Sequence, residues 1–394
     1  MINNLPNGWR IEELGKVFDV RDGTHDSPKY LENKGEGFPL ITSKNIKDGK
    51  LILEDCNYIS KNDYEKINQR SKVNINDIIM PMIGTIGNPH LIRIEPIYAI
   101  KNVALFKPKK ELPKYLIHYL NSNIIKQKFL FDSNGGTQKF VSLKYLRNLP
   151  IPIPQLQQQE KIIKVLDLSS NLIEKQKELL KNYDLFLKSK FIEMFGNPIK
   201  NTMKWETAQI KEVIVKVKND NPLKQPQKKY IYIDIGSIND KYIKHYNCIL
   251  GENAPSRAKQ ITIYNDVLVS TVRPNLNAVA IVKSKYESIL SSTGFCVLRT
   301  NNKNITPYYL FEIVKHKDFI QSLMNVAKGA SYPAVSNNDI LNLKISIPPL
   351  ELQNKFASIV ERIEIIKEKE NQKLKQLEDL HNSLMQKAFK GEIE

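Results

Sequence analysis

The sequence predicts an α+β (mixed α/β) fold in which two similar domains are joined by two long antiparallel coiled-coil helices with pseudo-two-fold symmetry. Three observations lead to this prediction. The two halves of the 394-residue chain can be aligned with each other, two segments carry apolar residues at heptad spacing, and the blocks between them alternate short β-rich runs with short helices. We expect domains over residues 1–154 and 197–348, one helix over 155–196, and a second helix with a short tail over 349–394.

Heptad spacing identifies the two long helices. Apolar side chains recur at intervals of seven residues. The first segment has no Gly or Pro inside it, and the rows of the second are interrupted by Glu370 and Lys373. The side chains expected to pack between the helices are Leu166, Ile173, Leu180, Leu187, Ile363, Leu377 and Leu384. Proline precedes each segment and glycine follows it, which matches the residue preferences of helix ends. A helix of about 40 residues is roughly 60 Å long, so we interpret the pair as a spacer.

An internal duplication relates the two halves of the chain. At an offset of 194, residues 135–159 align with 329–353, and with small gaps residues 76–88 align with 265–277. Each repeat is therefore a block of about 150 residues followed by a long helix. A two-fold repeat in one basic chain suggests the pseudo-two-fold symmetry with which proteins read a two-part DNA site.

Within each block, short runs of β-branched and aromatic residues alternate with turns. The runs expected to form strands are 38–42, 76–83, 91–94, 98–106, 230–235, 261–272, 278–283 and 294–299. One helix is expected at 113–130, and its counterpart at 307–326. This order of elements predicts that each block folds as a mixed domain.

The charge of the chain indicates a polyanionic partner. Lys and Arg number 59 against 42 Asp and Glu, which gives a net charge of +17 and a pI near 9.4. Residues 1–154 contain 23 basic and 16 acidic side chains and residues 197–348 contain 21 and 11, whereas the two helical segments are close to balance. A lysine-rich genome alone would not leave the helices balanced. The uneven placement therefore favours a surface that attracts phosphates over a simple bias of composition.

Other classes of protein are disfavoured by what the sequence does not contain. No apolar run approaches the roughly 20 residues of a membrane-spanning helix, and the first residues lack the apolar core of a signal peptide. Cys56, Cys248 and Cys296 are far apart in the sequence, so neither a zinc site nor a disulfide framework is indicated. We expect a soluble cytoplasmic protein with no bound metal and no membrane partner.

Loops rich in Gly, Ser, Thr, Asn, Lys and Arg indicate where double-stranded DNA would bind. Glycine lets the backbone approach phosphates, these polar side chains reach base edges, and arginine is the commonest reader of guanine. The candidate residues of the first block are Arg21, Thr24, His25, Ser43, Lys44, Thr85, Gln138 and Lys139. Those of the second block are Ser237, Arg273, Asn275, Asn277, Ser331 and Tyr332. The same residue types are common in ordinary turns, so a purely structural role stays open at each position.

No catalytic motif is found in the sequence. It contains no GxxxxGK[ST] phosphate loop and no GxGxxG after a strand. The Asn/Asp-Pro-Pro-aromatic motif of methylases is also missing, because residues 347–350 (IPPL) lack both its first and its last residue. The six histidines do not occur at metal-ligand spacing. We therefore expect no catalytic residues and no cofactor in this chain.

Seven segments make the chain similar to a known family. They are residues 5–9 (LPNGW), 22–30 (DGTHDSPKY), 137–159, 191–198 (FIEMFGNP), 292–299 (STGFCVLR), 329–353 and 384–392 (LMQKAFKGE). In content and order they resemble specificity subunits of Type I restriction–modification systems over essentially the whole chain.

The resemblance implies a division of labour between this chain and its partners. Two target-recognition domains would each read one half of a bipartite DNA site, while the paired helices would set the gap between the halves and dock two modification (methyltransferase) subunits. Restriction (translocase and nuclease) subunits would complete the complex. S-adenosylmethionine, ATP and Mg would serve those partners, which carry out adenine-N6 methylation, translocation and cleavage.

Three alternatives remain open from the sequence. The chain could be a specificity subunit of another class of restriction enzyme, or a coiled-coil DNA-binding scaffold without an enzymatic partner. It could also be an enzyme in its own right, which the missing cofactor motifs disfavour.

Overall fold

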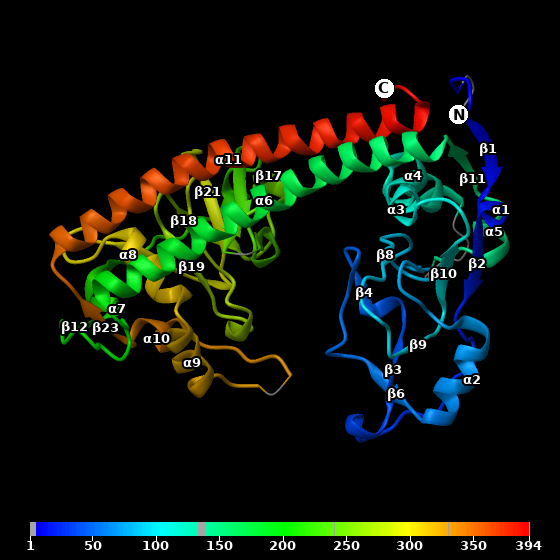
Figure 1. The fold of residues 1–394 in the computed structure, drawn as a ribbon. Coiled ribbons are helices and arrows are strands. Elements are labelled where there is room, and N and C mark those ends of the chain that lie inside the picture. Colours follow the sequence, from blue (N-terminus) through cyan, green and yellow to red (C-terminus); the bar gives the residue numbers. More distant parts are fainter. Residues whose placement is uncertain (1–4, 133–138, 240, 330, 394) are drawn as a thin grey trace. The chain divides into compact units, whose positions relative to one another are not determined.

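Two compact units make up the protein in the computed structural model. The model describes residues 5–132, 139–239, 241–329 and 331–393. Unit 1 comprises Met1–Lys177 with Gln372–Glu394, and unit 2 comprises Glu178–Asn371. Each of the two long helices, α6 (Leu156–Phe195) and α11 (Leu350–Lys390), contributes one half to each unit (Figure 1). The units therefore divide in the middle of the helices, whereas the sequence pattern divides the chain at the helix ends.

The described part of unit 1 contains a four-stranded sheet (β2-β10-β7-β8), a three-stranded sheet (β6-β3-β9) and two two-stranded ladders (β1-β11 and β4-β5). Only the β3–β9 pairing among them is parallel. The strands are β1 (Arg10–Glu13), β2 (Phe18–Asp22), β3 (Phe38–Ile41), β4 (Ile46–Lys47), β5 (Lys50–Leu51), β6 (Asn57–Ile59), β7 (Ile78–Pro81), β8 (His90–Leu91), β9 (Ala99–Ile100), β10 (Val103–Pro108) and β11 (Pro150–Ile153). The shorter helices are α1 (Leu14–Val17), α2 (Lys61–Ser71), α3 (Pro113–Asn121), α4 (Asn123–Asp132) and α5 (Leu143–Arg147), with the 3-10 turns η1 (Lys34–Glu36) and η2 (Ser43–Asn45).

Unit 2 repeats this architecture in the sheets β13-β22-β19-β20 and β17-β14-β21-β18 and the ladders β12-β23 and β15-β16. Its strands are β12 (Glu206–Gln209), β13 (Ile214–Val215), β14 (Lys229–Ile233), β15 (Ile238–Asn239), β16 (Tyr242–Ile243), β17 (Asn247–Leu250), β18 (Ala258–Thr262), β19 (Val267–Ser270), β20 (Val279–Ile281), β21 (Ile289–Ser292), β22 (Phe295–Thr300) and β23 (Lys344–Ile347). Its shorter helices are α7 (Ile210–Val213), α8 (Pro307–Lys315), α9 (Lys317–Val326) and α10 (Asn337–Leu341), with the 3-10 turns η3 (Pro222–Lys224), η4 (Ile235–Ser237), η5 (Gly251–Asn253) and η6 (Pro274–Leu276). By element order, β18 occupies the place that α2 has in unit 1.

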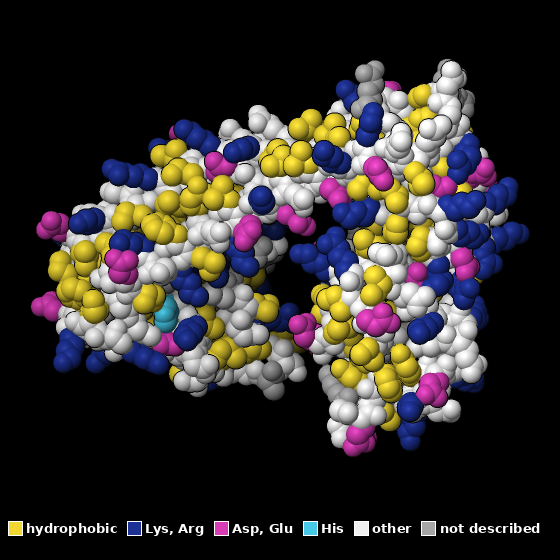
Figure 2. Space-filling model, viewed as in Figure 1, with side chains coloured by type: hydrophobic (Ala, Val, Ile, Leu, Met, Phe, Trp, Pro, Cys, Tyr) yellow, Lys and Arg dark blue, Asp and Glu magenta, His cyan; other side chains and the backbone are white. Residues whose placement is uncertain are grey.

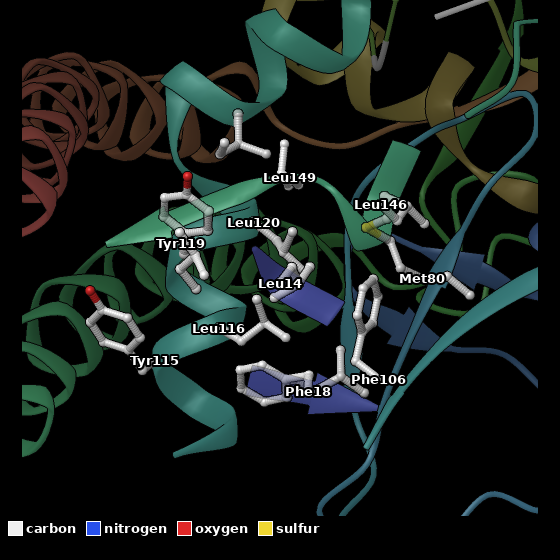
Figure 3. Packing of buried hydrophobic residues seen from close by; sticks show 14 of the residues in the cluster. Leu14, Phe18, Met80, Phe106, Tyr115, Leu116, Tyr119, Leu120, Leu146 and Leu149 are labelled. Carbon is white, nitrogen blue, oxygen red and sulfur yellow. The ribbon is translucent and has the colours of Figure 1, made fainter. Parts of the chain in front are cut away.

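The end of a long helix completes the main core of each unit. Figure 3 shows the apolar side chains of unit 1 that gather between the strands and α3, among them Leu14, Phe18, Met80, Phe106, Leu116 and Leu146. Phe389, near the end of α11, packs edge-on against Tyr115 and Tyr119 of α3, with ring centroids 5.5 and 5.1 Å apart. In unit 2, Phe195 at the end of α6 packs in the same way against Tyr309 of α8, at 4.8 Å. The two cores are thus built on one plan.

A buried ion pair is repeated in both units. Asp77 is 3% exposed in unit 1, and its carboxylate accepts a hydrogen bond from Lys107 Nζ. In unit 2, Asp266 is 1% exposed and binds Arg299 Nη2 at 2.7 Å. Both aspartates come just before a central strand (β7 or β19), and both cations lie on the strand paired with it (β10 or β22). This equivalence supports the internal duplication at the level of single side chains.

In unit 1, α6 and α11 run antiparallel to each other. Ser169 Oγ lies 2.8 Å from Nδ1 of His381, and Lys177 Nζ lies 2.9 Å from Oε1 of Glu378. A later position on α6 thus meets an earlier position on α11, which is the signature of antiparallel helices.

In unit 2, the remaining halves of α6 and α11 are also antiparallel. Lys367 Nζ lies 2.5 Å from Asp184 Oδ1, and the rings of Phe191 and Phe356 are 5.6 Å apart. Of the residues expected to pack between the helices, Leu166 and Leu187 are buried. The others are half-buried, namely Ile173, Leu180, Ile363, Leu377 and Leu384.

Two expected helices are each divided in two, so the prediction of one helix at 113–130 and one at 307–326 was wrong. Ser122 separates α3 from α4 and His316 separates α8 from α9, each with an extended backbone (ψ 147° and 139°). Their side chains accept hydrogen bonds from backbone N–H groups at the start of the following helix. This local capping competes with a continuous helix, although the apolar pattern continues across the break.

Two expected strands are also divided, and in both an asparagine makes the break. Asn102 (φ 54°) separates β9 from β10 within 98–106, and Asn265 (φ 68°) lies between β18 and β19 within 261–272. Asparagine tolerates the left-handed backbone conformation better than most residues. The chain therefore turns sharply inside runs that look continuous in the sequence.

Candidate nucleic-acid interface

The end of β2 and the loop that follows it carry three of the candidate residues. Arg21 is held by its own surroundings, because its Nε donates to Asp19 Oδ2 (2.8 Å) and its Nη1 to the carbonyl of Arg70 (3.0 Å). Thr24 Oγ1 accepts a hydrogen bond from the backbone N–H of Asp26 (3.1 Å). The structure therefore gives Arg21 and Thr24 roles in shaping this loop.

His25 extends from the same loop and connects it to a second one. Its side chain is 63% exposed, yet Nδ1 lies 2.7 Å from Asn102 Oδ1 and Nε2 lies 2.9 Å from Asp22 Oδ2. Gly23 allows this close approach, because a Cβ there would lie 2.3 Å from the carbonyl oxygen of Ile100. His25 is thus an exposed side chain whose ring is held in a fixed orientation.

Asn102 brings together two loops that are far apart in the sequence. Besides contacting His25, it accepts a hydrogen bond on its carbonyl from Ser43 Oγ (3.4 Å). Ser43 and the exposed Lys44 lie in η2, a turn that Thr42 and Asn45 cap. The candidates at 21–25 and 43–44 therefore form one patch. The sequence pattern missed Asn102, although an asparagine inside a β-rich run was a signal for a bend.

The second patch of unit 1 lies where the loop after β7 pairs with residues 139–141. Ile83 bridges to Phe140, and the N–H of Gly84 donates to the carbonyl of Lys139 (2.9 Å). Thr85 and Lys139 both have exposed side chains there. Gln138, the remaining candidate of this unit, lies outside the described residues.

Unit 2 repeats that pairing with different side chains. The N–H of Arg273 donates to the carbonyl of Pro333 (2.7 Å), and the N–H of Val335 donates to the carbonyl of Thr271 (2.9 Å). The Arg273 guanidinium lies over the ring of Tyr332, 4.3 Å from its centroid. The structure thus brings together two candidate residues that are 59 positions apart in the chain.

The turn after Arg273 adds two further candidates. Asn275 is exposed in η6. Asn277 closes this turn with φ 50°, and its side-chain amide donates to the carbonyl of Lys315 (3.2 Å). Ser331, next to Tyr332, is exposed as well. Five candidates of unit 2 therefore lie on two adjoining segments.

Ser237 requires a correction. It is 0% exposed, and both its N–H and its hydroxyl donate to Asp234 Oδ1 at 2.7 Å, which caps the turn η4. By element order it corresponds to the buried Asn45 of unit 1 rather than to an exposed loop residue. A side chain in this position stabilises its turn and does not reach DNA.

Hydrogen bonds attach the short helix α3 to the long helix α6 in unit 1. His118 Nε2 donates to Asp167 Oδ1 (2.8 Å) and Lys114 Nζ binds Oδ2 (2.5 Å), and these bonds lower the pKa of Asp167 to about 2. On α11, burial lowers the pKa of His381, and the nearby positive charge of His118 lowers it further. In unit 1, α6 is thus attached to the globular part through the carboxylate of Asp167.

The long helices also expose apolar side chains (Figure 2). On α6 these are Leu168, Leu172, Leu179, Leu185, Phe186 and Ile192, and on α11 they are Ile365, Ile366 and Leu380. In unit 1, a groove of about 680 Å³ beside Leu168 is lined by α3 and α6. Exposed apolar stripes of this kind are typical of protein–protein contact surfaces.

Within residues 5–132, 139–239, 241–329 and 331–393, no group of three or more His, Cys, Asp or Glu side chains is placed to hold a metal ion. None of the described helices is both long enough and apolar enough to cross a membrane.

Comparisons with known proteins agree with this architecture. The type I restriction modification DNA specificity domain matches the chain twice, at residues 6–182 and 203–379. The type I restriction enzyme MjaIX specificity subunit of Methanocaldococcus jannaschii is 25% identical, with 100% of this chain and 95% of the relative covered. The EcoKI specificity subunit of Escherichia coli K12 is 22% identical, with 99% and 90% covered.

Solved structures confirm the fold class. A chain from a type I restriction–modification complex superposes with a TM-score of 0.59 at 18% identity, with 99% of this chain and 100% of the other covered. The S subunit of the type I system of M. genitalium gives 0.53 at 14% identity, with 98% and 97% covered. The resemblance noted in the sequence is therefore confirmed, and the chain belongs to the family of type I restriction modification DNA specificity domains.

Proposed function

We propose that this chain is the DNA-reading subunit of a type I restriction–modification complex, in which each unit reads one half of a bipartite double-stranded site. The observation that carries the proposal is the presence of two specificity domains in one chain, each with its own core and each joined to both long helices. The excess of basic residues in the globular blocks supplies the attraction to phosphates that such binding needs.

We assign the DNA contacts to the candidate patches described above. In unit 1 the exposed His25, Lys44, Thr85 and Lys139 are the proposed contact residues. In unit 2 they are Arg273, Asn275, Ser331 and Tyr332, while Asn277 holds its turn through the carbonyl of Lys315. Arg21, Thr24 and Ser43 support the backbone of these patches through the hydrogen bonds that they make.

The long helices are the proposed docking surface for two methyltransferase subunits. Leu172 on α6 is 43% exposed and its neighbour Leu168 is 62% exposed, and burial of such side chains on a partner supplies about 25 cal/mol per Å². A Leu172→Glu variant is expected to lose co-purification of the methyltransferase, while Asn62→Glu at an exposed position of α2 serves as a control for added charge. Retention of the partner by L172E would contradict this assignment.

Catalysis and its cofactors belong to the partner subunits in this proposal. The methyltransferase subunits would bind S-adenosylmethionine, and the restriction subunits would bind ATP and Mg. This chain then acts in the cytoplasm, where the DNA to be modified or cleaved is found, and it supplies sequence recognition without a reaction of its own.

Methylation mapping tests the proposal. The full chain is co-expressed with its methyltransferase subunit, and the genome is compared with that of a strain expressing the methyltransferase alone. We expect adenine methylation at one bipartite motif that appears only when the chain is present. Methylation at an undivided motif, or an identical pattern in both strains, would contradict the proposed function. Co-purification without a methyltransferase would favour the scaffold alternative.

A further inference from the structure

The backbone at Arg273 is in a conformation that arginine rarely adopts. Its φ and ψ are 50° and 59°, in the left-handed region, where a side chain with a Cβ is strained. The equivalent position of unit 1 is Gly84 (φ 75°), and both residues donate their N–H to the segment opposite, at Lys139 and Pro333. Glycine adopts this conformation without strain. Unit 2 thus keeps an arginine where unit 1 has the residue that suits the backbone.

An aromatic ring supports one face of the Arg273 guanidinium. The guanidinium stacks on Tyr332, which is 67% exposed. Within the described part of the chain, no hydrogen bond or ion pair engages this guanidinium, whereas Arg147 and Arg299 use theirs on the carbonyl of Val20 and the carboxylate of Asp266. A cation stacked on a ring keeps the N–H groups at its edge free to donate.

We propose that Arg273, positioned by Tyr332, reads a guanine in the half-site of unit 2, and that Gly84 leaves unit 1 without the corresponding contact. This inference rests on the proposed function and specifies one determinant of its sequence preference. Backbone strain retained at a half-buried loop residue such as Arg273 points to a function for that residue. The planar fork of arginine matches O6 and N7 of guanine in the major groove, and a fork held by stacking loses little freedom when it binds.

A base-preference measurement on variants of Arg273 tests the main claim. The full chain, assembled with its methyltransferase, is titrated with duplexes in which each base pair of the methylated motif is replaced in turn. We expect Arg273→Ala to lower the preference for guanine at one position of one half-site by about tenfold or more, with the other half-site unchanged. Arg257→Ala removes the same charge from another exposed loop of unit 2 and is expected to leave every base preference intact.

The same titration separates base reading from phosphate binding. Uniform weakening of Arg273→Ala on all duplexes, with a salt dependence reduced by about one ion, would identify a phosphate contact and overturn the inference. If the wild-type complex showed no bipartite preference at all, the proposed function itself would fail. A bipartite wild type with an unchanged Arg273→Ala profile would remove only the role of Arg273.

The positioning role of Tyr332 has its own test. Tyr332→Phe keeps the aromatic ring and is expected to retain the guanine preference, whereas Tyr332→Leu is expected to reduce it toward that of Arg273→Ala. Rescue by phenylalanine is the result that a ring-stacking role requires. Equal preferences in the leucine and phenylalanine variants would show that stacking does not position the arginine.

The difference between the units predicts a gain of specificity. A Cβ at Gly84 would meet no atom within 4 Å, so the space beside it is open. In the sequence alignment, Gln138 is the counterpart of Tyr332. Gly84→Arg combined with Gln138→Tyr is expected to add a guanine preference to the half-site of unit 1, with Gly84→Ala as the control for backbone strain. A double variant that still binds but shows no new preference would overturn the equivalence of the two positions.

Discussion

Phe389→Ala is expected to destabilise unit 1 while leaving unit 2 intact. The ring is 2% exposed and packs edge-on against Tyr115 and Tyr119. Its removal loses the transfer free energy of the ring and two aromatic contacts, and it leaves a cavity in the core. Together these effects destabilise a protein by about 3–5 kcal/mol for a buried phenylalanine. That is a large share of the stability of an ordinary domain, roughly 5–15 kcal/mol. Core strands of unit 1 should therefore lose amide protection by roughly two to four orders of magnitude.

Hydrogen exchange followed by mass spectrometry measures the amide protection of each unit separately, because β10 and β22 occupy equivalent places in the sheets of the two units. In Phe389→Ala, β10 should lose protection and β22 should not. The duplication provides the matched control, since Phe195 is 0% exposed and packs on Tyr309 in unit 2. Phe195→Ala should therefore give the opposite pattern. Equal loss in both strands, or a change below tenfold in β10, would refute the claim that each helix end completes one core.

Three further predictions concern pH, charge and length. Burial and His118 lower the pKa of His381 in the folded chain, so the unfolded chain binds the proton more readily. Unit 1 should therefore lose stability as pH falls below about 6.5. In urea titrations from pH 7.5 to 5.5, His381→Gln should flatten this dependence. Asp266→Ala leaves the charge of Arg299 without its buried partner and should lower the free energy of unfolding by about 3 kcal/mol. A loss below about 1 kcal/mol in denaturant titrations would contradict this. Insertion of one heptad into the middle of both α6 and α11 adds about 10 Å of helix. Methylation mapping should then find that the gap between the two halves of the motif is longer by about three base pairs. An unchanged gap would show that the helices do not set it.

Much of the architecture could be predicted from the sequence because it follows from periodicity and duplication. A heptad pattern determines a long helix with little ambiguity, and both ends of α6 and the start of α11 lie within one residue of the expected bounds. The breaks at Ser122 and His316 could not be predicted in the same way. At both positions the apolar pattern is continuous, and the helix ends only because a single side chain caps the next one.

In the candidate interface, too, some features could be predicted from the sequence and others could not. Exposed loop residues such as Lys44 and Tyr332 were identifiable from composition. Ser237 was misassigned because the short polar motif around it is equally typical of a capped turn, and only the fold shows its hydroxyl on Asp234. The stacking of Arg273 on Tyr332 depends on a pairing between distant segments, which no local pattern encodes.

The end of α11 completes the core of unit 1, and this affects how the chain folds during synthesis. Unit 2 is one continuous stretch, whereas the core of unit 1 includes Met385, Ala388 and Phe389, which the ribosome adds more than 260 residues after Tyr119. The first domain to emerge must therefore wait, incomplete, until translation is nearly finished, in contrast to the usual order in which N-terminal domains fold first. A premature stop codon near the end of the gene would consequently harm the product's beginning more than its middle.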